Sequence, residues 1–157
     1  MRTAYTGRIE SARNEERGGS PVCSLVSKLI EALRSELHDY GEMLYLLDQQ
    51  QESIMARAED DVLRSVGAIN DQMIRIQSDR QQRAARQNEA ARLLNKADDP
   101  TFQSVIPALP EKYRVAVGSL VRENNELLVR VRRRAQQNQQ FLSRSLELMQ
   151  RVINSLP

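Results

Sequence analysis

The last third of the chain is a long stretch that almost lacks helix-breaking residues. Pro110 and Pro157 bound it, and only Gly118, a weak helix former, interrupts it. In its first part, apolar residues recur every three or four positions, which is the spacing of one helix face: Tyr113, Val117, Leu120, Leu127 and Val131. We therefore predict one continuous helix over residues 110–156, about 70 Å long at 1.5 Å per residue.

The apolar pattern of this stretch breaks and then resumes. Residues 132–140 (RRRAQQNQQ) offer almost nothing to bury. Beyond them the apolar residues are Phe141, Leu142, Leu146, Leu148, Met149, Val152 and Ile153. The predicted helix thus has two apolar ends separated by a polar middle. We expect the first end to serve the fold and the second to be free for a partner; the alternative is that the second end packs on the first helix of the chain.

A second long apolar seam begins near the N-terminus. Ser20 can cap a helix there, and Pro21 fits a first helical turn. The seam steps by three and four through Val22, Val26, Leu29, Leu33, Leu37, Tyr40, Leu44, Leu47, Gln51, Ile54 and Ala58. It predicts a coiled-coil-like first helix over residues 21–58. Residues 1–20 are polar and aperiodic and end in two glycines, so we expect a disordered tail there.

Between these two seams lies a shorter apolar face. Asp60 or Asp61 is the best available cap for it, and its members are Val62, Leu63, Val66, Ile69, Met73 and Ile76. Pro100 must end the helix that carries it, so we predict a second helix over 61–97 and a short helical turn over about 101–107. Residues 21–157 would then form a single all-α domain, an elongated antiparallel three-helix bundle or coiled coil with a long C-terminal helix.

Composition and charge agree with thin seams rather than a thick core. Hydrophobic residues make up 40% of the 157 residues and aromatic residues 4%, with no tryptophan. Residues 21–60 hold three basic and eight acidic residues (net −5), whereas 111–157 hold nine basic and four acidic residues (net +5). We expect the first and third helices to lie side by side with complementary faces; an acidic partner is the alternative. Nucleic acid is disfavoured, because basic residues alternate with acidic ones and no aromatic platform accompanies them.

No constellation of residues predicts catalysis or a cofactor. His38 is the only histidine, Asp98 and Asp99 have the position of turn residues, and the single Cys23 excludes a disulfide framework within one chain. The sequence has no run of about 18 apolar residues and no signal-peptide pattern. We therefore expect a cytoplasmic protein that is not an enzyme, binds no metal and does not insert into membranes.

Residues 36–52 (ELHDYGEMLYLLDQQQE) contain a Leu-Leu pair followed by acidic residues and glutamines, and residues 120–128 (LVRENNELL) are asparagine-rich. A helix turn is expected near Asp60, and a glutamine-rich linker precedes the amphipathic residues 141–156. This layout bears a resemblance to the FlgN-type flagellar export chaperones. The resemblance covers residues 25–156, and its motifs are helix patterns rather than fixed chemistry.

The resemblance implies a cytoplasmic, non-enzymatic chaperone of flagellar assembly. Such proteins bind the C-terminal region of hook-filament junction (hook-associated) proteins of the FlgK and FlgL types, prevent their premature assembly and bring them to the export gate. A client that assembles through an apolar stripe on one of its helices must have that stripe covered until export, and an amphipathic helix of the chaperone can cover it. The residues expected to bind it are Phe141, Leu142, Leu146, Met149, Val152 and Ile153.

Two other functions remain open at this point. A structural coiled coil or adaptor would use residues 141–153 to complete a homodimer, and a type III secretion chaperone of another system would have a similar helical shape. Asn124 and Asn138 fall on seam positions, where a polar residue can set the register of packed helices at some cost in stability.

Overall fold

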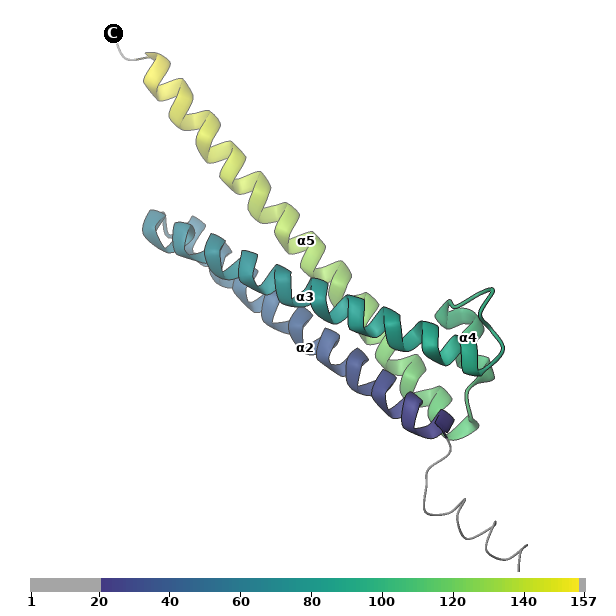
Figure 1. Cartoon of the computed structure of the whole chain (residues 1–157). Helices are drawn as coiled ribbons and strands as arrows, with labels where there is room; N and C mark the ends of the chain where they lie inside the picture. The colour runs from purple at the N-terminus through teal and green to yellow at the C-terminus, as the bar shows by residue number, and fades with distance from the viewer. Residues whose placement is uncertain (1–20, 156–157) are drawn as a thin grey trace, which may run out of the picture.

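The structure, a computed structural model, describes residues 21–155, and the tail predicted for residues 1–20 lies outside them. The described residues form four helices and no strand (Figure 1), so the all-α fold is confirmed. The helices are α2 (Pro21–Met55), α3 (Glu59–Leu93), α4 (Phe102–Ala108) and α5 (Glu111–Ser155).

The first two long helices form a hairpin that ends earlier at each turn than the sequence pattern predicts. The helix expected over 21–58 ends at Met55, and the one expected over 61–97 ends at Leu93. In both places a residue that is not glycine adopts the left-handed conformation, Arg57 at φ 55° and Asn95 at φ 57°. The amides of Ala58 and Lys96 then donate to the carbonyls five residues before them, at 3.0 and 2.7 Å. This is the Schellman arrangement that closes a helix end.

Helix α2 is the central element, because both other long helices pack on it. Helix α3 runs antiparallel to α2, and α5 runs parallel to α2 on another side (Figure 1). Near the N-terminus of α2, the core contains Leu25, Val26, Leu29, Leu33, Ala90, Ala91, Val105, Leu109 and Val117. Helix α4 contributes Val105 to this cluster and therefore closes that end of the bundle. A second cluster lies toward the α2–α3 turn and contains Tyr40, Met43, Leu47, Ile76 and Val131.

Two asparagines fix the register of α5 on α2. Asn124 donates from Nδ2 to the carbonyl of Leu33 at 2.9 Å, and Asn138 donates from Nδ2 to the carbonyl of Leu47 at 2.8 Å. Asn124 and Asn138 are 14 residues apart on α5, and the accepting residues Leu33 and Leu47 are also 14 residues apart on α2. This spacing is two heptads on each helix. Because both asparagines are buried, a shift of α5 along α2 would break both hydrogen bonds between the helices without replacing them by bonds to water.

Complementary charge also joins α2 to α5, but less than the sequence suggests. Asp48 of α2 forms an ion pair with Arg134 of α5 at 3.0 Å. Glu36, in contrast, is buried and pairs with α3: its Oε2 lies 2.8 Å from Nε of Arg83. The acidic face of α2 is therefore shared between its two neighbours.

Candidate functional site

No residue of α5 beyond Val131 belongs to either apolar cluster of the described chain. Helix α5 has 45 residues, ten more than α2 or α3, and the excess corresponds to about 15 Å. In Figure 1 it diverges from the hairpin toward its C-terminal end and projects past the α2–α3 turn. From Gln139 to Ser155, every residue is exposed except Leu142, which is half-buried.

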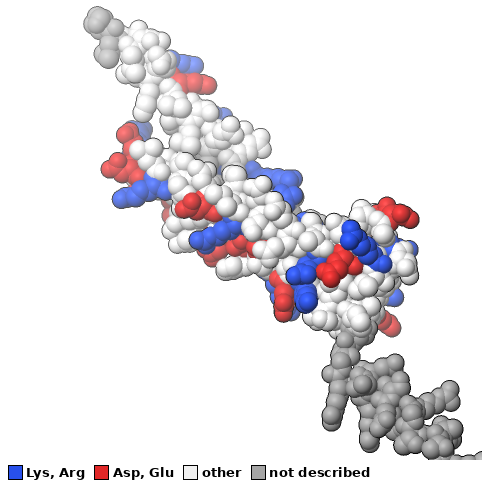
Figure 2. All heavy atoms as spheres, viewed as in Figure 1, with Lys and Arg blue, Asp and Glu red and all other residues white. Residues whose placement is uncertain are grey.

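The structure places all six predicted partner-binding residues on this projecting segment. Phe141 is 39% exposed, and Leu146, Met149, Val152 and Ile153 are between 51% and 66% exposed. Leu148, at 60%, adds to the same apolar surface. Much of this part of α5 is uncharged in the view of Figure 2. For a helix with this many aliphatic side chains, such exposure leaves apolar area that burial against a partner would stabilise.

The exposed surface continues the face by which α5 packs in the bundle. The buried positions of α5 recur every seven residues: Val117, Asn124, Val131 and Asn138. The next two positions of this series are Ser145 and Val152, and both are exposed. The core-facing stripe of α5 therefore extends beyond the last layer that the bundle covers, by 17 residues or about 25 Å.

The last covered layer is polar and links all three long helices. Asn138 of α5 donates from Nδ2 to Oε1 of Gln50 at 3.1 Å, and Gln50 of α2 donates from Nε2 to Oγ of Ser65 on α3 at 2.9 Å. This layer holds α5 in place through hydrogen bonds rather than through apolar burial. Beyond it, Ser145 offers no apolar side chain at the next core position, and α2 ends at Met55.

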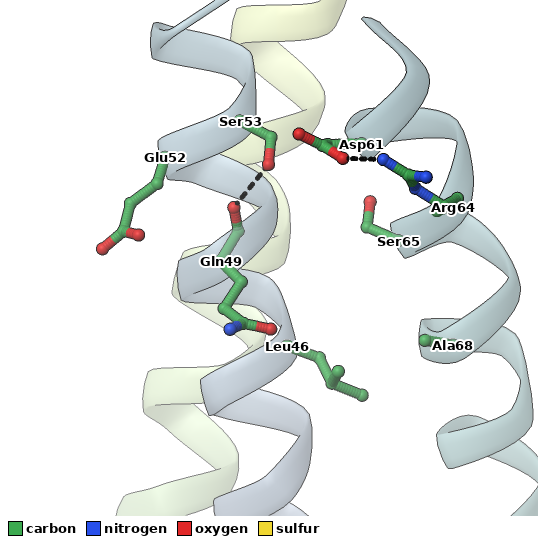
Figure 3. Close-up of a pocket in the computed structure, with 8 residues that line it drawn as sticks. All are labelled: Leu46, Gln49, Glu52, Ser53, Asp61, Arg64, Ser65 and Ala68. Atoms are coloured by element: carbon green, nitrogen blue, oxygen red, sulfur yellow. Dashed lines mark hydrogen bonds and ion pairs between the residues drawn. The ribbon is translucent and has the colours of Figure 1, made fainter. Parts of the chain in front are cut away.

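A hollow near the hairpin turn is the other candidate for a site (Figure 3). It measures about 400 Å³ and is lined by Leu46, Gln49, Glu52 and Ser53 of α2 and by Asp61, Arg64, Ser65 and Ala68 of α3. Asp61 and Arg64 pair with each other, and Oγ of Ser53 donates to the carbonyl of Gln49 at 3.1 Å. Its charged groups thus lie paired at the rim or turned outward (Figure 3), and they do not converge on a common point as a catalytic site requires.

Within residues 21–155, no group of three or more His, Cys, Asp or Glu side chains is placed to hold a metal ion. Among the four described helices, none has the apolar length needed to span a bilayer.

The fold and this surface define an all-α protein that presents the uncovered end of an amphipathic helix. A family model described as "FlgN protein" matches residues 25–157. The comparisons with curated proteins and with solved structures gave no match. Since the family model spans most of its length, the chain belongs to the FlgN family, which is a family of flagellar export chaperones.

Proposed function

We propose that this protein is a cytoplasmic chaperone that binds the C-terminal region of hook-associated proteins. It covers the apolar stripe by which these clients assemble, prevents their premature assembly and brings them to the export gate. One observation carries the proposal: the core-facing stripe of α5 continues past Asn138 through positions that are exposed in the described chain. Family membership supplies the class of client.

The physical basis is the pairing of two amphipathic helices. A client helix that polymerises through an apolar stripe is kept soluble when another helix buries that stripe. Each large aliphatic side chain that leaves water contributes about 1.5–3 kcal/mol. Ordering and association costs offset part of this sum, so the net gain is on the order of several kcal/mol. The methionine and leucine side chains of this surface can adjust to more than one client stripe.

The proposal is tested by changing the apolar side of the segment. The double variant Phe141→Asp/Met149→Asp is titrated with the C-terminal segment of the FlgK-type hook-associated protein of the same bacterium. We expect the affinity to fall about 100-fold, because two buried apolar contacts worth about 3 kcal/mol are replaced by charges. The matched control is Gln150→Asp/Asn154→Asp on the polar side of the same segment, which should bind like the wild type. Undiminished binding by the first variant would refute the site.

A homodimer is the competing use of the same surface. In that case the free protein would be a dimer by light scattering, and truncation after Gln140 would convert it to a monomer. For the chaperone we expect the client segment to bind with one chain per complex, and the truncated chain to lose this binding. A dimer that persists without client and ignores the client segment would favour the structural role.

A further inference from the structure

Helix α3 carries a second exposed apolar face near the projecting part of α5. Its members follow helical spacing: Val62, Val66, Ile69, Met73 and Ile76. Ile76 is buried and Ile69 is partly buried, and both belong to the cluster that includes Val131 of α5. Val66 and Met73, by contrast, are 45% and 55% exposed. We call these two residues the α3 face.

The α3 face lies on the side of α3 that is turned to α5. At 100° per residue, Val66 and Met73 lie about 100–120° round α3 from Gln72, which bonds to the backbone of α2. They lie on the same side as Ile69, whose cluster includes Leu127 and Leu128 of α5. The hollow described above is on the opposite side, since Ala68 is about 200° round the helix from Val66.

Helix α5 leaves this face uncovered because its polar anchors reach α2. Asn124, Arg134 and Asn138 each contact α2 directly. Asn138 reaches Ser65 of α3 only through Gln50. Toward the turn of the hairpin, α5 and α3 diverge (Figure 1).

Helix α5 presents a corresponding apolar face of its own. Leu128 packs in the cluster that contains Ile69, and Leu142 and Leu146 follow it by 14 and 18 residues, about four and five helical turns. These two leucines therefore continue the side of α5 that is turned to α3. We call them the α5 face. The α3 face and the α5 face thus both adjoin the cluster that includes Ile69 and Leu128, and they continue it with side chains that the chain does not bury.

We infer that a single client helix packs against the α3 face and the α5 face together. It completes the core that α2, α3 and α5 leave open, and its position is continuous with the packing that already joins them. Such a client helix carries aliphatic side chains on two adjoining sides, because it has an apolar neighbour on each. This inference rests on the proposed function and adds α3 to the binding site.

A second copy of residues 141–155 fits this position poorly. Its apolar residues share one side of the helix, and the other side is occupied by Arg144, Glu147, Gln150, Arg151 and Asn154. In a second copy, that one apolar side would have to pack against the α3 face and the α5 face of the other chain, which lie on two different sides of the occupant. A separate helix with two apolar sides has no such conflict.

The test compares two sides of α3 in the full-length chain. Val66→Asp/Met73→Asp changes the α3 face, and the control Ile74→Asp changes an exposed side chain that lies about 80–100° round α3 from the α3 face. Each is titrated with the fluorescently labelled C-terminal segment of the FlgK-type protein. We expect the first variant to bind at least about tenfold more weakly and the control to bind within about twofold of the wild type.

A cross-linking measurement keeps the test independent of folding. A benzophenone side chain is introduced at Met73 or, as control, at Ile74, and should cross-link the client segment only from Met73. Equal cross-linking from both positions, or an α3-face variant that binds like its control, would overturn the inference. If Phe141→Asp/Met149→Asp still abolishes binding in that case, the proposed function stands and only the role of α3 fails. A wild-type dimer that the α3-face variant dissociates would also overturn it, with a second copy as the occupant.

Discussion

Glu36 and Tyr40 form a buried polar pair in the middle of an apolar seam. The hydroxyl of Tyr40 donates to Oε1 of Glu36 at 2.8 Å, and Arg83 pairs with the other carboxylate oxygen at 2.8 Å. The guanidinium of Arg83 also lies over the ring of Phe102, 5.8 Å from its centroid. Glu36 is therefore paired rather than an isolated buried charge, and it connects α2, α3 and α4.

Burial and the hydrogen bond to Glu36 raise the pKa of Tyr40 to about 12. An unfolded tyrosine ionises near pH 10. The raised pKa therefore stabilises the fold fully below about pH 10, and this contribution is lost as the pH rises toward 12. We expect Tyr40→Phe to lower the free energy of unfolding by about 1.5–3 kcal/mol at neutral pH, as for a hydrogen bond to a charged group. Urea unfolding of the wild type and of Tyr40→Phe from pH 7 to 11.5 measures this difference in the free energy of unfolding, which should become smaller above pH 10. A difference that stays constant with pH would show that the Tyr40 hydroxyl does not donate to Glu36.

At the scale of the elements, the helices follow from sequence periodicity while their ends do not. The three-and-four spacing of the apolar residues was sufficient to predict three long helices. Their ends depend on Arg57 and Asn95, which adopt positive φ although neither is glycine. Arginine carries no signal for this conformation, so the turn between α2 and α3 was misplaced by a few residues. Asn95 is a known alternative to glycine at this position and was the one available signal.

For the buried polar residues, the sequence likewise predicts some of the buried positions but not which groups they bond to. Asn124 and Asn138 could be assigned to the core from their seam positions, because a heptad position is fixed by spacing. Their partners could not be found, since Leu33 and Leu47 accept through backbone carbonyls, which every residue has. Gln50 was also missed, because it is buried only where α3 and α5 both reach α2.

The register of α5 can be tested through Asn124. Its Nδ2 faces the carbonyls of Leu33 and Leu120, each at 2.9 Å. Asn124→Asp replaces this donor with an acceptor, so we expect a loss of about 2–4 kcal/mol in the free energy of unfolding at pH 7. The pKa of the buried carboxyl would be raised, so the loss should shrink as the pH falls and the carboxyl becomes a donor. Urea unfolding at pH 7 and pH 4.5 measures it, with Asn125→Asp, an exposed neighbour, as the control; an equal loss in both variants would contradict the hydrogen bonds.

At the scale of the whole molecule, one helix has two tasks. The first part of α5, through Asn138, is covered by the bundle, and the rest projects with its apolar side exposed. The sequence could predict this division because residues 132–140 interrupt the apolar pattern. It could not predict that α5 packs mainly on α2 and leaves Val66 and Met73 of α3 exposed, since this depends on how three helices are arranged in space.

The central claim is that the apolar end of α5 awaits another polypeptide. Backbone hydrogen exchange measures it in the full-length chain, with and without the client segment. We expect amides of residues 141–155 to exchange quickly in the free protein and to become protected when the segment is added. Amides around Asn124 should be protected in both states. Protection of residues 141–155 before any client is added, or no change after it, would contradict the account.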